Sequence, residues 1–128
     1  QFHRWIIQPT AVLVKRLRQA CPGVPIIGFP RGAGLMYEDF VKLSGVDAIG
    51  IDNAVPVNWA AANLQGKCTV QGNLDNHALV AGGGALEMET RAILETLEGG
   101  PFIFNLGHGI LPETPPEHVH RLVELIRG

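Results

Sequence analysis

The sequence predicts an α/β fold with a parallel sheet, and three observations support this prediction. Short apolar runs of strand length recur at 24–29, 47–52, 68–73 and 102–106. Each run is followed by a loop and then by a stretch in which apolar residues have helical spacing. The runs are apolar at successive positions, which is typical of strands covered on both faces. Strands that alternate with helices in this way form βα units.

The first helical stretch covers residues 2–20, with apolar residues on one side and basic residues on the other. Pro9 fits a first helical turn, so we expect a short helix to break there and a longer one to follow. The sequence Cys-Pro-Gly at 21–23 ends this helix.

Four units of strand, loop and helix follow. The strand and helix of each unit are expected at 24–29 with 35–43, 47–52 with 59–64, 68–73 with 79–97, and 102–106 with a last helix that begins at 115–117. Glycines at 82–84 interrupt the third of these helices, so its regular part covers 86–97. The inner face of the last helix carries Val119, Leu122, Val123 and Ile126.

Two architectures fit this pattern: a small doubly wound sheet, or part of a (β/α)8 barrel. The loop Arg31-Gly32-Ala33-Gly34 is rich in glycine but lacks the G-x-G-x-x-G spacing of a phosphate loop, so it is weak support for the doubly wound sheet. A complete (β/α)8 barrel takes about 250 residues. The four predicted strands of these 128 residues would form half of one.

Composition excludes several classes of function. The net charge is −2 and no basic run is present, which argues against partners such as nucleic acids or anionic membranes. No apolar run has transmembrane length. Cys21 and Cys68 have no metal-type spacing and read as reduced thiols of a cytoplasmic protein. The sequence begins with Gln1 within a helical pattern, so we expect a fragment of a longer chain.

The stretch 102–117 contains the most distinctive sequence of the chain. An apolar strand breaks at Gly107-His108-Gly109 and leads into a proline-rich turn that opens a helix. A histidine flanked by glycines at the carboxyl end of a strand is well placed to present its side chain, because glycine leaves room for a bulky group. The residue types alone also fit a tight turn with an incidental histidine.

The order of residues in this stretch is more specific. Residues 105–117, Asn-Leu-Gly-His-Gly-Ile-Leu-Pro-Glu-Thr-Pro-Pro-Glu, closely resemble the carboxyl-terminal signature of the uroporphyrinogen decarboxylase family. Residues 70–75, Val-Gln-Gly-Asn-Leu-Asp, resemble the penultimate strand of that family, and the match runs in register along the chain. The resemblance implies that residues 1–128 are a single domain, the C-terminal half of a (β/α)8 TIM barrel.

The resemblance implies the reaction as well. Enzymes of this family remove four acetate carboxyl groups from uroporphyrinogen III in heme biosynthesis, giving coproporphyrinogen III. They use no cofactor, because the protonated pyrrole ring accepts the electrons left by departing CO2. The partner is thus a tetrapyrrole substrate, and the family is typically a homodimer. The fragment alone is expected to be inactive.

Two residues are candidates for substrate binding. The resemblance places the histidine of the Gly-His-Gly motif, His108, in the substrate cleft. Arg31 at a loop tip suits recognition of substrate carboxylates through its fork of donors, although a solvated loop arginine is an equal alternative. The key aspartate of the family lies in the N-terminal half, so no catalytic residue is assigned within these residues.

Other polar residues after the strands have structural interpretations. Asp52, Asn73 and Asp75 fit helix caps or closed turns. If the strands are parallel, however, these residues, Arg31, Asn53, Asn105 and His108 all share one rim. Asn76 stands where the family usually has proline, and we expect it to loosen the turn without touching a group that does chemistry.

No metal site is predicted. His118 and His120 are two residues apart near the start of the last helix, so they face different sides. Trp5 and Trp59 are expected to fill helix–sheet packing, and Phe29 and Phe104 to face the helices or the barrel interior.

Three alternatives to the decarboxylase remain. A methyltransferase of the same barrel superfamily would hold zinc through cysteine and histidine at the strand ends. A half-barrel module could bind a tetrapyrrole without turnover. A doubly wound domain would have a strand order other than sequential neighbours.

Overall fold

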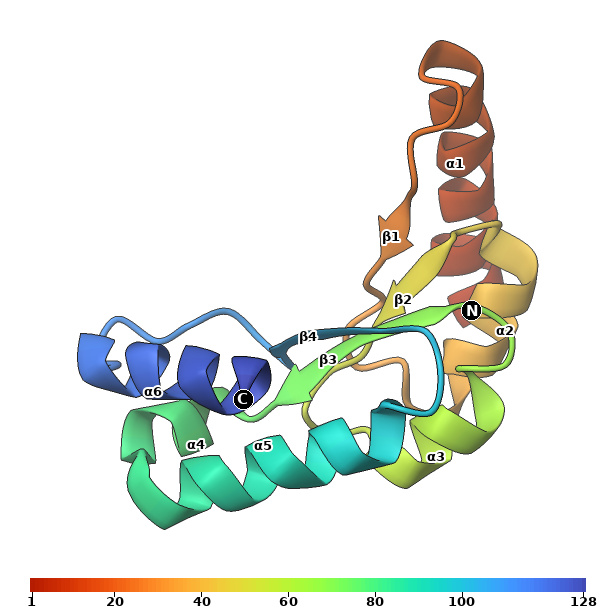
Figure 1. Cartoon of the computed structure of the whole chain (residues 1–128). Coiled ribbons are helices and arrows are strands. Elements are labelled where there is room, and N and C mark those ends of the chain that lie inside the picture. Colours follow the sequence, from red (N-terminus) through yellow and green to blue (C-terminus); the bar gives the residue numbers. More distant parts are fainter.

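The structure, a computed structural model, describes all of residues 1–128. Its helices and strands alternate along the chain (Figure 1). In order they are the π-helix η1 (His3–Ile7), α1 (Gln8–Ala20), β1 (Ile27–Gly28), the 3₁₀-helix η2 (Gly34–Met36), α2 (Tyr37–Ser44), β2 (Ala48–Gly50), α3 (Val57–Asn63), β3 (Thr69–Leu74), α4 (Asn76–Ala81), α5 (Gly83–Leu97), β4 (Phe102–Leu106) and α6 (Pro116–Arg127). None of the helices combines the length and apolar character needed to span a lipid bilayer.

The four strands form one parallel sheet in the order β1-β2-β3-β4, so each strand pairs with its neighbour in the sequence. This order confirms the predicted βα units. It contradicts the doubly wound alternative, which required strands that are not sequential neighbours. Consecutive parallel strands with intervening helices are the arrangement found in half of a (β/α)8 barrel.

One face of the sheet carries the hydrophobic core, and the other is open. Ile49 pairs in register with Val70, and Val70 with Phe102, so these side chains share the covered face. Ile49 and Val70 are fully buried in one cluster with apolar residues of α2, α3 and α5. One position further along the strands, Gln71 and Ile103 point to the open face, where Ile103 is 42% exposed.

The prediction of a buried strand at 24–29 is wrong in both length and burial. β1 consists of Ile27 and Gly28 alone, and Ile27 and Phe29 are 46% and 49% exposed. The reason is that β1 is an edge strand with β2 on one side only, and its open face is not covered. A pattern of apolar residues cannot distinguish an edge strand from a central one.

The predicted break at Pro9 is also wrong, because the backbone stays helical from η1 into α1. Ile7, at the junction, has helical angles of φ −66° and ψ −51°. The N–H of Gln8 donates to the carbonyl oxygen of His3, five residues earlier, as in a π-helix. This wider turn accommodates the proline ring, which has no N–H to donate. Trp5, which was predicted to pack between helix and sheet, is 65% exposed, so this prediction is wrong as well.

The predicted interruption at 82–84 is confirmed, because α4 and α5 meet at Gly82, which has φ +67°. The imidazole of His118 packs directly over Gly82, where a side chain would clash. Its Nδ1 lies 3.0 Å from the carbonyl oxygen of Leu79. His118 therefore joins α6 to α4, whereas His120 is exposed.

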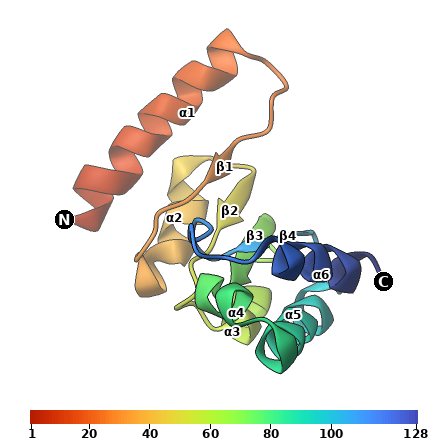
Figure 2. The same cartoon turned by 90° about the vertical axis from the view of Figure 1, so that its left-hand side faces the viewer.

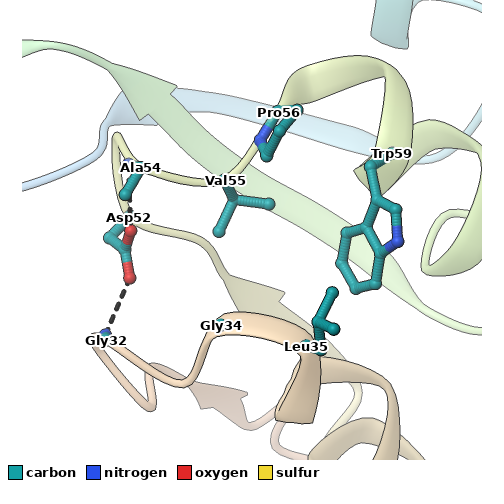
Figure 3. Close-up of a pocket in the computed structure, with 8 residues that line it drawn as sticks. All are labelled: Gly32, Gly34, Leu35, Asp52, Ala54, Val55, Pro56 and Trp59. Carbon is teal, nitrogen blue, oxygen red and sulfur yellow. Dashed lines mark hydrogen bonds between the residues drawn. The ribbon is translucent and has the colours of Figure 1, made fainter.

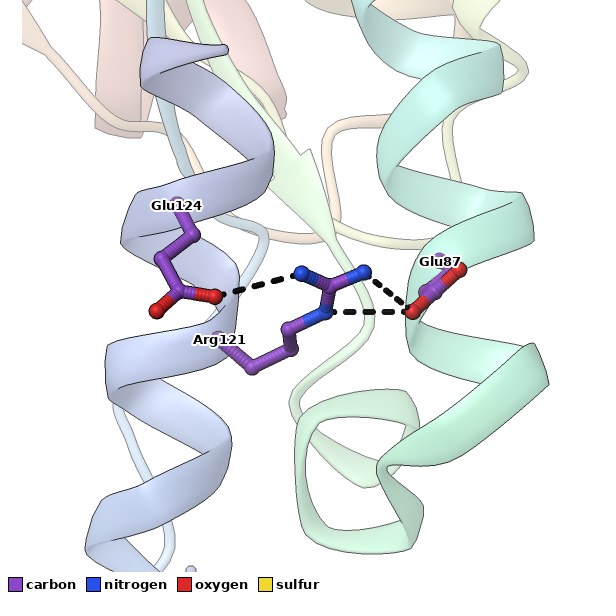
Figure 4. A network of polar contacts seen from close by, with 3 residues as sticks. All are labelled: Glu87, Arg121 and Glu124. Atoms are coloured by element: carbon purple, nitrogen blue, oxygen red, sulfur yellow. Dashed lines mark hydrogen bonds and ion pairs between the residues drawn. The ribbon is translucent and has the colours of Figure 1, made fainter.

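Arg121 connects α6 to α5 on the surface (Figure 4). Its Nη2 and Nε donate to Oε1 of Glu87 at 2.7 and 3.1 Å, and its Nη1 donates to Glu124 at 3.1 Å. Hydrogen bonds from Arg121, and then its charge, lower the pKa of Glu87. These side chains are between 36% and 67% exposed, so dissolved salt screens the ion pairs and their contribution to stability is small.

Both edge strands of the sheet are open in the 128-residue polypeptide. The outer backbone groups of β1 and β4 have no neighbouring strand, and the open face exposes Ile27, Phe29 and Ile103. We therefore expect this polypeptide, produced by itself, to self-associate. Sedimentation velocity over a range of concentrations measures the effect, and a folded monomer at every concentration would contradict it.

Candidate functional site

A hollow of about 420 Å³ lies on the open face of the sheet, toward the carboxyl ends of the strands. The loop after β1, the strands β2, β3 and β4, and the loops after β2 and β4 contribute its lining residues: Phe29, Gly50, Ile51, Gln71, Asn105, Leu106, His108, Gly109 and Ile110. Its wall combines aromatic and aliphatic surface with two amides and one imidazole. Such a wall suits a flat apolar group that carries polar substituents.

His108 lies at this hollow because the residue before it is fixed against neighbouring loops. The N–H of Gly107 donates to the carbonyl oxygen of Leu74 at 2.8 Å, which continues the pairing of β3 with β4 beyond the strands. Gly107 also lies against the backbone of Asn53 so closely that a side chain would clash. A glycine is therefore required before His108, which is itself partly exposed.

Asn76, the first residue of α4, contacts the loop that carries His108. The residue is 4% exposed, and its Nδ2 donates to the carbonyl oxygen of Gly109 at 2.9 Å. Asn76 therefore has a contact that the prediction of a loosened turn after β3 did not include. Because β3 and β4 are neighbours, a polar residue after β3 can reach the loop after β4, and this adjacency is the signal that could have identified the contact.

Asp52 follows β2, and its carboxylate joins the loop after β2 to the loop after β1 (Figure 3). Its Oδ2 accepts hydrogen bonds from the N–H of Gly32 and from the hydroxyl of Tyr37, both at 2.7 Å. Its Oδ1 accepts one from the N–H of Ala54 at 3.0 Å. The hydroxyl of the fully buried Tyr37 also accepts from the backbone N–H of Asp52 at 3.2 Å. The predicted turn-closing role of Asp52 is thus confirmed and extended to a second loop.

These contacts set the ionisation of both side chains. Burial by itself raises the pKa of Asp52, but the hydrogen bonds from Gly32, Tyr37 and Ala54 and the charge of Arg31 outweigh it, so the pKa lies below its ordinary value. Burial, and then the hydrogen bond to Asp52, raises the pKa of Tyr37. At neutral pH the pair is therefore a carboxylate with a neutral phenol donor.

A second hollow, of about 360 Å³, lies between the loops after β1 and β2. Figure 3 shows Asp52 at one end of it and Leu35 opposite Trp59 at the other. The Asp52 oxygens already accept hydrogen bonds from the protein, so the free surface of this hollow is mainly apolar. Trp59 is half-buried against the core, which confirms its predicted packing role.

Asp75 holds the turn after β3, as predicted, whereas Asn73 lies within β3 and holds the loop after β2 rather than the turn that follows its own strand. Asp75 is the N-cap of α4, and its Oδ1 accepts from the N–H of His77 at 2.9 Å. This backbone hydrogen bond is the main reason that the pKa of Asp75 is lowered. Nδ2 of the buried Asn73 donates to the carbonyl oxygens of Asp52 and Val55, both at 2.8 Å. Neither residue lines the hollow that contains His108.

Arg31 is exposed at the tip of the loop after β1, next to the Gly32 that Asp52 holds. It does not line the hollow that contains His108. The two predicted substrate-binding residues are therefore separate in this structure. A molecule that contacts both has to extend from the hollow toward the loop after β1.

Comparison of the sequence with known proteins adds to this geometry. A family profile described as uroporphyrinogen decarboxylase (URO-D) matches residues 1–128. The chain belongs to the uroporphyrinogen decarboxylase family. This finding confirms the resemblance drawn from the Gly-His-Gly stretch at 107–109.

Several curated relatives named uroporphyrinogen decarboxylase are similar to the chain. Those of Rhodospirillum rubrum, Rhizorhabdus wittichii and Sphingopyxis alaskensis are 54%, 53% and 49% identical to it over 128 residues. Each match covers 100% of this chain and 37% of the relative. The chain thus spans little more than a third of the length of these family members.

The polar residues expected to share one rim do not form a single group. Asn105 and His108 meet at the open hollow, whereas Asp52, Asn73 and Asp75 are directed into the loops that they hold. Sequence reasoning missed Gln71, the other amide of the hollow. The alternation of side chains along β3 could have identified it, since Val70 beside it reads as a core residue.

The two cysteines lie toward the amino ends of the strands. Cys21 is exposed after α1, and Cys68 directly precedes β3. No group of three histidine, cysteine, aspartate or glutamate side chains comes together in a geometry that could hold a metal ion. The positions of the thiols therefore do not match the zinc site that the methyltransferase alternative requires.

Proposed function

We propose that this chain is part of a uroporphyrinogen decarboxylase, a carboxy-lyase that converts uroporphyrinogen III to coproporphyrinogen III in heme biosynthesis. The observation that carries the proposal is the match of residues 1–128 to the family, together with relatives of that name at 49–54% identity. On this proposal the 128 residues are the second half of a (β/α)8 barrel, and the rest of the longer polypeptide completes it.

The hollow on the open face supports this substrate class. A porphyrinogen is a large, mainly apolar macrocycle with acetate and propionate groups at its rim. Phe29 and Ile110 offer apolar surface to the ring, and the amides of Gln71 and Asn105 offer donors to the carboxylates. In this proposal His108 binds one substrate carboxylate within the hollow. Arg31 binds a second carboxylate, on the part of the substrate that extends beyond the hollow.

The proposed chemistry uses no cofactor. A proton adds to the pyrrole carbon next to the one that bears the acetate arm, and the ring becomes cationic. The bond between the methylene and the carboxylate then breaks, CO2 leaves, and its electron pair neutralises the ring. Protonation of the methylene and loss of the proton from the ring carbon leave a methyl group. The protein has to hold the ring, stabilise its positive charge and deliver protons.

On this proposal the carboxylate that stabilises the ring cation lies outside these residues. Asp52 and Asp75 already accept hydrogen bonds from the loops that they hold, which supports this assignment. The same proposal expects the 128-residue polypeptide to be inactive alone, and the complete enzyme to be a cytoplasmic homodimer.

A chimera tests the proposed function. These 128 residues replace the matching region of the Rhodospirillum rubrum relative, which is 54% identical. Uroporphyrinogen III is the substrate, and both coproporphyrinogen III and CO2 are measured for the chimera and for the 128-residue polypeptide. We expect turnover by the chimera and none by the polypeptide.

Other outcomes would change the proposal in defined ways. Turnover by the polypeptide alone would place the catalytic acid within these residues, with Asp52 and Asp75 as the first carboxylates to substitute. Binding of the porphyrinogen by the chimera without release of CO2 would instead indicate a tetrapyrrole-binding module.

A further inference from the structure

The Gly-His-Gly loop is attached to the fold on both sides of His108. On the amino side, the N–H of Gly107 donates to the carbonyl oxygen of Leu74 at 2.8 Å. On the carboxyl side, Nδ2 of Asn76 donates to the carbonyl oxygen of Gly109 at 2.9 Å. Leu74 is the last residue of β3 and Asn76 is the first residue of α4, so both attachments come from the same strand–helix unit. His108 therefore lies between two residues that are both held by this unit.

The two attachments differ in kind. The first is a backbone contact that continues the sheet, and any residue in place of Leu74 would retain it. The second depends on one side chain. Gly109 is exposed and no atom lies within 4 Å of where its side chain would be, so nothing packs against it on that side. As a glycine it also has wide conformational freedom, which makes the hydrogen bond from Asn76 the main local restraint.

Asn76 is itself held rigidly. The residue is 4% exposed, and it is the first residue of α4, directly after Asp75, which caps that helix. His118 contacts the carbonyl oxygen of Leu79 further along α4, so the helix is also fastened to α6. A restraint from Asn76 therefore fixes the position of Gly109 relative to the whole strand–helix unit.

We propose that Asn76 is a positioning residue, which holds His108 in the orientation that binds a substrate carboxylate. This inference rests on the proposed function of His108 as a substrate-binding residue. It assigns Asn76 no contact with the substrate. The residue acts through the Gly109 carbonyl, and its effect on the reaction is transmitted by His108.

The test uses the full-length chimera with Asn76→Ala, and with Asn76→Asp as a variant of nearly equal volume. Loss of one neutral hydrogen bond to the loop is expected to raise KM for uroporphyrinogen about fivefold, with kcat changed much less. Asn63→Ala is the matched control, because Nδ2 of Asn63 donates to the carbonyl oxygen of Trp59, away from the hollow. The control is expected to leave KM unchanged.

A double-mutant cycle separates positioning from general stability. If Asn76 acts through His108, adding Asn76→Ala to His108→Ala has no further effect on KM. Independent effects of the two substitutions would overturn the proposal. So would an unchanged KM in both Asn76 variants.

NMR of the histidine ring signals gives a readout that does not depend on turnover. Substitution of Asn76 is expected to shift the signal of His108 and to leave that of His118 in place. An unmoved His108 signal would overturn the proposal, and movement of both signals would show that Asn76 only stabilises α4. A chimera without turnover would refute the proposed function, while the NMR result would still decide whether Asn76 positions His108.

Discussion

Replacing Asp52 with alanine is expected to destabilise the fold by roughly 3–5 kcal/mol, because three donors, one of them the buried hydroxyl of Tyr37, lose their acceptor together. The carboxylate accepts from the N–H of Gly32, the N–H of Ala54 and the hydroxyl of Tyr37. Tyr37 is fully buried, so its hydroxyl loses a protein partner in a place that solvent reaches poorly. Urea unfolding of wild-type and Asp52→Ala polypeptides at equal concentration measures the difference.

Tyr37→Phe is the matched comparison for this prediction. It removes one donor from the same carboxylate and leaves the hydrogen bonds from Gly32 and Ala54 in place. A loss of about 1–2 kcal/mol is therefore expected. If Asp52→Ala costs no more than Tyr37→Phe, then the carboxylate does not join the two loops in the way that the hydrogen bonds indicate.

The lowered pKa of Asp52 adds a pH dependence with a defined sign. A carboxyl group whose pKa is lower in the folded state contributes stability that is fully present above its unfolded pKa, about 4, and is lost as the pH falls through the folded pKa. The difference in unfolding free energy between wild type and Asp52→Asn should therefore shrink as the solution is acidified below about pH 4. A difference that is constant with pH would contradict the assignment of this shift to Asp52.

The parts of the fold that the sequence predicts well are those governed by local patterns. The strand at 102–106 has the bounds that its apolar run predicts. The predicted helix at 79–97 is interrupted at Gly82, within the run of glycines that indicated the break. The parallel direction of the strands also follows from the alternation of strands and helices, whereas their order does not, because a doubly wound sheet has the same alternation. Each of these features depends on residues close together in the sequence, where backbone preferences and periodicity are informative.

The parts that differ depend on contacts between distant residues. Ile27 and Phe29 read as buried because their types are apolar, but their exposure is decided by whether another strand lies beside β1. The hydrogen bond from Asn76 to Gly109 joins residues 33 positions apart. Asp52 was recognised as a turn residue, yet its bonds to Gly32 and Tyr37 join separate units and have no local signature.

The candidate site shows the same division. The Gly-His-Gly motif identifies His108 from the sequence. The structure explains why the first glycine is needed, because Gly107 lies too close to Asn53 to carry a side chain. The hollow around His108, by contrast, is lined by residues from all four strand–helix units, which are distant in the sequence. The alternation of side chains along β3 indicates that Gln71 faces away from the core, but the register of the sheet is needed to place it in this hollow.

His108→Ala is expected to lower kcat/KM of the chimera for uroporphyrinogen by roughly 10- to 100-fold. An imidazole that donates to a carboxylate makes a charge-assisted hydrogen bond, and loss of such a bond costs about 1.5–3 kcal/mol. If His108 binds a substrate carboxylate throughout the reaction, the loss is found mainly in KM. Steady-state kinetics of decarboxylation, with the first and the last acetate measured separately, tests this expectation.

The control for this substitution is His120→Ala, because His120 lies exposed on α6 and outside the hollow. It is expected to leave both kcat and KM unchanged. A fall in kcat alone in His108→Ala would show that the imidazole acts in the transition state, as a proton donor would, rather than as a binding group. Wild-type kinetics in His108→Ala would remove His108 from the site altogether, and Gln71 and Asn105 would then be the remaining polar side chains of the hollow to substitute.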